Sequence, residues 1–63
     1  MNNLRLLRHK RKMTQQSLAD KLGVTRSAVT KWENGEAYPR AELLTKLAGI
    51  LHCKIDALFC VKV

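Results

Sequence analysis

The chain has 63 residues, of which 46% are hydrophobic, and its formal net charge is +7 at pH 7. This length suits one small domain, and the hydrophobic fraction is too high for a disordered tail. No apolar run approaches the roughly 20 residues that span a bilayer, and the N-terminal stretch lacks the apolar centre of a signal peptide. We therefore expect a single domain over residues 1–63, soluble and intracellular, whose charge attracts nucleic acid rather than a membrane surface.

The stretch 3–12 is predicted to form a helix with an apolar side and a basic side. Leu4 and Leu7 recur at helical spacing and can face a core, whereas the basic residues lie mostly outside. A basic run is usually a solvated helix face. In this chain we expect it to add general electrostatic affinity for DNA, in preference to a nuclear-localisation role.

The stretch 15–34 is predicted to form a helix, a tight turn and a second helix. Leu18, Ala19 and Leu22 place one apolar stripe on the first helix. Thr14 is placed to cap that helix, and Gly23 ends it because glycine adopts the left-handed conformation without a Cβ penalty. Thr25 can then cap the second helix, which begins near Arg26 and stops at Asn34-Gly35.

The second helix of this motif has two distinct faces. About 100° of rotation per residue places the polar and basic residues on one arc and the apolar residues, among them the only tryptophan, on the opposite side. A polar outer face with an apolar back suits insertion into a DNA major groove, but an ordinary helical corner with a solvated face has the same pattern. The arc consists of Arg26, Ser27, Thr30, Lys31 and Asn34, and the apolar side of Ala28, Val29 and Trp32.

Short motifs along nearly the whole chain decide between these two interpretations. They are Leu4-Arg5, Leu7-Arg8, Thr14-Gln15, Leu18-Ala19, Gly23-Val24-Thr25, Val29, Trp32-Glu33, Asn34-Gly35, Pro39, Leu44, Leu47-Ala48, Leu51, Ile55 and Leu58-Phe59. In residue type and spacing they resemble the Cro and phage-repressor helix-turn-helix family, also called the XRE family. Three positions depart from the family pattern and bear on turn geometry: Lys12 and His52 stand where the family often has glycine, and Cys53 where it usually has a β-branched residue.

The resemblance implies a fold and several residue roles. The fold is an all-α, lambda-repressor-like DNA-binding domain of five short helices, with the helix-turn-helix at 15–34. The resemblance also implies a structural ion pair between Arg8 and Glu33. Together with positions at helix ends, it implies contacts to DNA phosphates from Gln15, Asn34, Tyr38 and Arg40. From their common arc, we predict that base edges are read by Arg26, Ser27, Thr30 and Lys31.

The C-terminal part is predicted to supply a core helix and a dimer interface. Leu43, Leu47 and Leu51 recur at four-residue spacing, so residues 40–51 should form an amphipathic core helix, followed by one or two helical turns over 55–59. One recognition helix reads few base pairs, and specificity of the repressor kind usually comes from two half-sites bound by a two-fold dimer. We expect Ile55 and Leu58 to join the core. An exposed apolar cluster then remains as the homodimer interface, although the same residues would also serve to close the monomer core: Phe59, Cys60, Val61 and Val63.

We expect no metal, cofactor or catalytic site. Cys53 and Cys60 have neither a disulfide-framework pattern nor zinc-finger spacing, so apolar packing is favoured for them. No Ser/His/Asp or Cys/His pairing has a recognisable context, which argues against an enzyme. His9 and His52 are interpreted as surface and turn residues.

The sequence thus predicts a sequence-specific regulator of transcription that binds double-stranded DNA. We expect a repressor that binds a palindromic operator as a homodimer, in the cytoplasm at the nucleoid. A protein-interaction module of the antitoxin or adaptor kind is the alternative. An RNA-binding role is disfavoured by the scarcity of aromatic residues.

Overall fold

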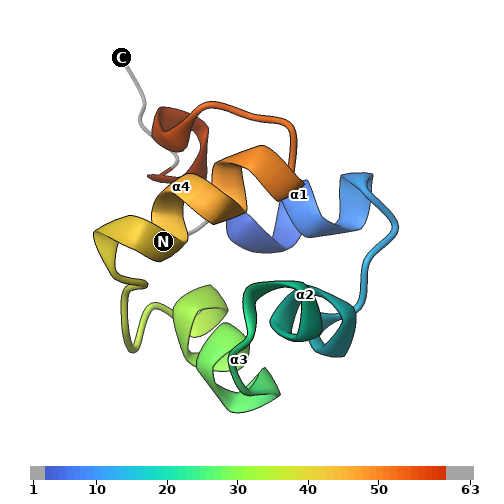
Figure 1. Cartoon of the computed structure of the whole chain (residues 1–63), viewed down its shortest axis with the longest axis vertical. Coiled ribbons are helices and arrows are strands. Elements are labelled where there is room, and N and C mark those ends of the chain that lie inside the picture. The colour runs from blue at the N-terminus through green and yellow to red at the C-terminus, as the bar shows by residue number, and fades with distance from the viewer. Residues whose placement is uncertain (1–2, 60–63) are drawn as a thin grey trace.

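The computed structural model describes residues 3–59, without the side chains of Asp56 and Phe59. The described chain contains the α-helices α1 (Leu4–Lys10), α2 (Gln15–Leu22), α3 (Arg26–Asn34) and α4 (Ala41–Ile50), followed by the 3₁₀ helix η1 (Ile55–Phe59). In Figure 1, α2 and α3 lie together below α1, α4 and η1. Among residues 3–59 there is no strand, so the all-α class is confirmed for this part of the chain.

Of the five short helices that were predicted, four are α-helices, and the last helical segment is a 3₁₀ turn. Within it, the backbone N–H of Ala57 donates to the carbonyl of Lys54 at 3.0 Å, three residues back. A segment of five residues is too short for several α-helical hydrogen bonds, and the tighter 3₁₀ turn is common in such short pieces. The described chain therefore has four α-helices and one short 3₁₀ helix.

The predicted caps of the helix-turn-helix are confirmed. The hydroxyl oxygen of Thr14 accepts from the backbone N–H of Ser17 at 3.0 Å, and that of Thr25 accepts from Ala28 at 3.2 Å. Gly23 ends α2 with φ +72° and Gly35 ends α3 with φ +78°. Both glycines thus adopt the left-handed conformation, which costs them less than any residue with a Cβ.

The two outer helices are shorter than predicted. The expected helices over 3–12 and 40–51 are observed as α1 and α4, which end at Lys10 and Ile50. Lys12 and His52, just beyond them, have φ +55° and +53°. The chain therefore keeps a left-handed turn at both positions although neither residue is a glycine.

One core is shared by all five helical elements. Trp32 is only 5% exposed, so its predicted place in the core is confirmed. Leu58 of η1 is fully buried as expected, whereas Ile55 is 40% exposed and its assignment to the core was wrong. A single 3₁₀ turn inserts few side chains into a core, and Ile55 lies at the rim where that turn begins. The buried apolar residues are Leu4, Leu18, Ala19, Leu22, Val29, Trp32, Leu47, Leu51 and Leu58.

Two side chains attach the ends of the fold to each other. The amide nitrogen of Asn3 donates to the carbonyl of Ala57 at 2.8 Å, and the Arg11 guanidinium donates to the carbonyl of Leu51 at 3.3 Å. Each bond joins the α1 region to the C-terminal half across at least 40 residues of sequence. α1, α4 and η1 are thus joined to one another, and we call these three elements the frame. The α2–α3 corner packs against this frame.

Candidate nucleic-acid interface

Helix α3 turns an apolar side inward and a polar side outward. Val29 and Trp32 are buried against the other helices, whereas Arg26, Ser27 and Lys31 are exposed. Asn34, the last residue of α3, is exposed as well, and so are Tyr38 and Arg40 in the segment after it. Several predicted interface residues thus lie on the surface, on α3 and on the segment directly after it.

Thr30 differs from its neighbours on α3 because it is half-buried and already hydrogen-bonded. Its hydroxyl oxygen lies 3.1 Å from Oε1 of Gln15 and also 3.1 Å from the carbonyl oxygen of Arg26. A hydroxyl has one proton, so it donates to one of these two acceptors at a time. Thr30 therefore joins α3 to the start of α2.

Gln15 connects α2 to both ends of α3. Its Nε2 donates to Oε1 of Glu33 at 2.9 Å, and its Oε1 faces Nε of Arg26 at 3.5 Å. A carboxylate only accepts and a guanidinium only donates, so these two neighbours determine which way the amide points. The side chain of Gln15 thus holds Arg26 and Thr30 beside the first turn of α2.

Arg8 and Glu33 form a buried ion pair behind this surface. Nε of Arg8 donates to Oε2 of Glu33 at 2.6 Å, and Nη2 donates to Oε1 at 3.3 Å. The two side chains are 8% and 4% exposed, and Nη1 of Arg8 also donates to the carbonyl of Met13 at 2.7 Å. This two-point contact fixes α1 against the C-terminal end of α3.

The surroundings of Glu33 favour its charged form. Burial alone raises the pKa of the Glu33 carboxyl, but hydrogen bonds from Arg8 and Gln15, together with the charges of Arg8 and Arg5, lower it by more. The net result is a pKa below the usual value. The carboxylate therefore stays charged, and able to accept these hydrogen bonds, at neutral pH.

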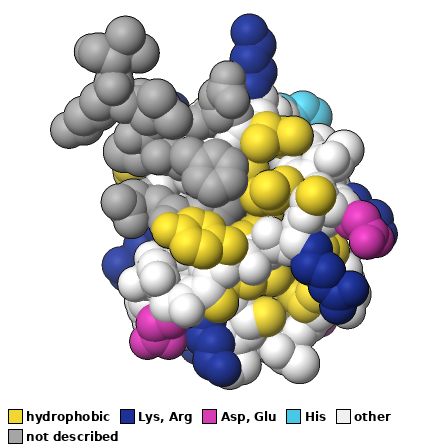
Figure 2. Space-filling model, turned by 90° about the vertical axis from the view of Figure 1, so that its left-hand side faces the viewer, with side chains coloured by type: hydrophobic (Ala, Val, Ile, Leu, Met, Phe, Trp, Pro, Cys, Tyr) yellow, Lys and Arg dark blue, Asp and Glu magenta, His cyan; other side chains and the backbone are white. Residues whose placement is uncertain are grey.

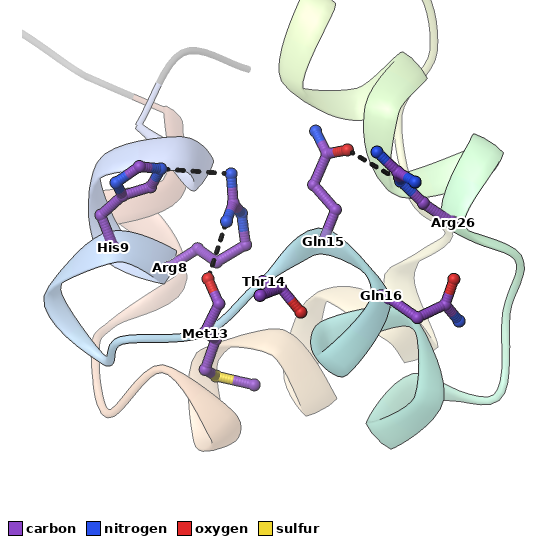
Figure 3. A pocket seen from close by; sticks show the side chains of 7 residues that line it. All are labelled: Arg8, His9, Met13, Thr14, Gln15, Gln16 and Arg26. Carbon is purple, nitrogen blue, oxygen red and sulfur yellow. Dashed lines mark hydrogen bonds between the residues drawn. The ribbon is translucent and has the colours of Figure 1, made fainter.

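A hollow of about 520 Å³ lies where α1, α2 and α3 meet. Figure 3 shows Arg8 and His9 on one side of it and Gln15 and Arg26 on the other. A smaller hollow of about 330 Å³ adjoins the outer face of α1 and is lined by Arg5, Leu6 and His9. The larger hollow is lined by Arg8, His9, Met13, Thr14, Gln15, Gln16 and Arg26. Its charged side chains are cationic, which suits an anionic ligand.

The structure brings some of the predicted site residues together and leaves others apart. Gln15, Arg26 and Thr30 are in contact with one another. Cys60, Val61 and Val63, predicted for the dimer interface, lie outside the described residues, as does the side chain of Phe59. His9, which lines the larger hollow, was not predicted from the sequence as a residue of the DNA-binding site. Its position next to Arg8, the predicted partner of Glu33, was the available signal.

Nothing in residues 3–59 points to a metal site. No group of three or more His, Cys, Asp and Glu side chains in the described part of the chain is placed to hold a metal ion. Cys53 is half-buried and packs against the core. Burial raises the pKa of its thiol, and the charge of Arg11 lowers it by less, so the thiol stays protonated and weakly reactive. A search of the described residues finds no helix long and apolar enough to cross a membrane.

Known proteins share this sequence pattern. The chain matches the family described as "Helix-turn-helix" over residues 4–58. It is 43% identical over 56 residues to YqaE, an uncharacterised HTH-type transcriptional regulator of Bacillus subtilis (strain 168), and the match covers 89% of this chain and 48% of YqaE.

Two further relatives have a direction of regulation in their names. The chain is 40% identical over 55 residues to the HTH-type transcriptional activator BcrR of Enterococcus faecalis, across 87% of this chain and 27% of BcrR. It is 40% identical over 45 residues to the cryptic phage CTXphi transcriptional repressor RstR of Vibrio cholerae, across 71% of this chain and 40% of RstR. The chain spans less than half the length of each of these relatives. From the match across residues 4–58, the chain belongs to the helix-turn-helix family of transcriptional regulators.

Proposed function

We propose that this chain is a sequence-specific DNA-binding regulator that places α3 in the major groove of double-stranded DNA. The observation that carries the proposal is the polar side of α3, whose exposed Arg26, Ser27 and Lys31 stand on a helix fixed from behind by the Arg8–Glu33 pair. Guanidinium and ammonium groups suit guanine O6 and N7, and hydroxyls suit several base edges. Thr30 joins this base-reading set through its hydroxyl, next to Gln15.

The residues that flank α3 are proposed to contact the DNA backbone. Gln15 is the first residue of α2 and Asn34 the last residue of α3. Tyr38 and Arg40 lie between α3 and α4. Contacts of this kind position a protein on the duplex without reading its sequence. Arg40 carries the only formal positive charge among these four. Its contact should therefore contribute to the salt dependence of DNA affinity.

We further propose that the chain represses transcription as a homodimer on a palindromic operator, in the cytoplasm at the nucleoid. One recognition helix reads few base pairs, and a two-fold partner supplies the second half-site. Exposed apolar surface supports an interface, because Ile55, at the start of η1, is 40% exposed. Figure 2 shows apolar side chains gathered in the middle of one face of the molecule. The proposed dimer contacts are Phe59, Cys60, Val61 and Val63, and repression is supported by the likeness to RstR.

The decisive experiment is selection of bound duplexes from a randomised pool, followed by binding measurements on three variants. We expect Arg26→Ala and Lys31→Ala to cost about 1–3 kcal/mol on the selected duplex and much less on random-sequence DNA. Arg40→Ala removes the same charge outside α3. It should flatten the slope of log affinity against log salt by about one unit and leave the selected sequence unchanged.

Three outcomes would count against parts of this proposal. Equal losses on selected and random DNA would mean that Arg26 and Lys31 only neutralise phosphate. A changed consensus for Arg40→Ala would contradict a backbone contact. A protein-interaction module would select no preferred duplex. In transcription from a promoter carrying the selected site, a repressor lowers the transcript level and an activator raises it.

A further inference from the structure

Among the ionisable side chains that line the large hollow, one has no role in the binding scheme above. His9 is exposed on α1 and lines both the large hollow and the smaller one beside Arg5 and Leu6. In Figure 3 its ring points toward the Arg8 guanidinium, across the hollow from Gln15 and Arg26. An imidazole at this place is of interest because histidine ordinarily changes its charge between pH 5 and 8.

The contact between His9 and Arg8 gives one ring nitrogen the role of an acceptor. Nε2 of His9 lies 3.3 Å from Nη2 of Arg8. A guanidinium has donors and no acceptor, so the hydrogen bond runs from Arg8 to His9 and requires an unprotonated Nε2. Arg8 is fixed by its bonds to Glu33 and to the carbonyl of Met13, so it stays in place whatever happens to the ring.

The charged groups around His9 are almost all positive. Arg5 and Arg8 come from α1 and Arg26 from α3, while α2 contributes only the neutral Gln15 and Gln16 to the hollow. The Glu33 carboxylate, which binds Arg8 and Gln15, has a buried side chain and does not line the hollow. A proton on His9 would therefore end one hydrogen bond and add a cation beside others. An anion in the hollow would attract the protonated ring and so offset both the lost hydrogen bond and the repulsion between the cations.

We propose that His9 contacts a phosphate of the DNA backbone in its protonated form, so that DNA binding is coupled to the uptake of one proton. This inference rests on the proposed DNA-binding function and adds to it a residue and a pH dependence. The phosphate supplies the negative charge that the hollow lacks, between His9 on α1 and Gln15 and Arg26 on the opposite side. The contact is to the backbone, so it acts on any duplex sequence.

Proton uptake makes two measurable predictions. Affinity for DNA should rise as the pH falls, by about tenfold between pH 7.5 and 5.5 if close to one half of a proton is taken up per molecule across that range. The protonated ring also neutralises one more phosphate, so the slope of log affinity against log salt should be steeper at pH 5.5, by at most about one unit. A residue that only supports the fold would change neither the pH profile nor this difference in slope.

The test compares three variants on two duplexes, one selected from a randomised pool and one of random sequence. His9→Gln keeps an acceptor for Arg8 but cannot become charged, and it should lose most of the pH dependence on both duplexes. His9→Lys carries a permanent charge and should bind at pH 7.5 as tightly as the wild type does at pH 5.5. His52→Asn removes the other imidazole, which lines neither hollow, and tolerates the left-handed φ of that position. It should behave like the wild type.

Each alternative result has a definite meaning. The same pH profile for the wild type and His9→Gln, or loss of the profile in His52→Asn, would overturn the inference while leaving DNA binding intact. A pH effect confined to the selected duplex would mean that His9 reads a base, which overturns the phosphate contact. If the wild type binds neither duplex at any pH, the proposed DNA-binding function fails, and the inference fails with it.

Discussion

Glu33 has both a structural and a positioning role, and the two depend on the same carboxylate. It pairs with Arg8, which attaches α1 to α3, and it accepts from Gln15, which in turn faces Arg26 and Thr30. Loss of its charge would therefore weaken an ion pair and release the amide that positions the polar side of α3. We therefore expect stability and the proposed DNA recognition to be coupled at this residue.

The depressed pKa of Glu33 predicts a pH dependence of stability. A carboxyl whose pKa is lower in the folded than in the unfolded state contributes stability that is complete above the unfolded pKa. That contribution is lost as the pH falls through the folded pKa. We expect Glu33→Gln to lower the free energy of unfolding by about 3 kcal/mol at neutral pH, because it leaves Arg8 without its charged partner. Between neutral pH and strong acid the difference from the wild type should shrink.

Denaturant unfolding of both proteins at several pH values measures this difference. Glu36→Gln is the matched control, because Glu36 is exposed in the loop after α3. It should track the wild type at every pH. A stability difference between Glu33→Gln and the wild type that stays constant into strong acid would show that the Glu33 charge does not contribute.

At the scale of elements, all four α-helices end in the same way. In each, a backbone N–H just beyond the helix donates to the carbonyl five residues back, at 2.9 to 3.1 Å, across a residue with positive φ. This is the hydrogen-bond pattern of a Schellman motif. α2 and α3 use glycine at the left-handed position, and α1 and α4 use Lys12 and His52. The closing bonds run from Met13 to Arg8, Val24 to Ala19, Glu36 to Lys31 and Cys53 to Ala48.

The two left-handed residues without glycine predict stabilising substitutions. Lys12→Gly and His52→Gly should each raise the free energy of unfolding by about 0.5–1 kcal/mol, because glycine adopts positive φ without the steric cost of a Cβ. Lys46→Gly, the same change as Lys12→Gly but inside α4, should instead lower it by about 1 kcal/mol. Thermal or denaturant unfolding gives the three values. A destabilising Lys12→Gly would mean that its side chain makes a contact worth more than the relieved strain.

At the scale of the whole molecule, the frame of α1, α4 and η1 supports the α2–α3 corner. Leu4, Leu47 and Leu58 are fully buried, one from each element of the frame. A domain of this size buries only a small apolar core. An oligomeric partner would therefore add stability as well as a second half-site. The proposed homodimer places that partner at the C-terminal end.

The dimer proposal predicts a change of mass on truncation. Sedimentation of the intact chain at micromolar concentration should give a dimer, and a form ending at Leu58 should give a monomer, because the shorter form lacks the proposed contacts from Phe59 onward. Thermal unfolding of the shorter form checks that the remaining core is folded. Two monomers or two dimers would contradict a C-terminal interface, and the recognition helices would then be paired by another surface or on the DNA.

The sequence by itself determined the local features of this protein. The α2–α3 corner, its caps at Thr14 and Thr25 and its glycine stop at Gly23 were predictable because each follows from hydrogen bonds and backbone conformations within a few residues. The apolar spacing likewise placed Trp32 in the core. These features depend on neighbours along the chain, which a sequence displays directly.

Only the tertiary structure decided which side chains meet across the elements. The contacts of Gln15 with Glu33 and Thr30 join residues 18 and 15 positions apart, and the hollow that includes His9 needs three helices at once. The same holds for Ile55 and Leu58 of η1, of which the first is 40% exposed and the second fully buried. Periodicity shows which face of a helix is apolar. It does not show how deep a short segment sits, because depth depends on the packing of all the other elements.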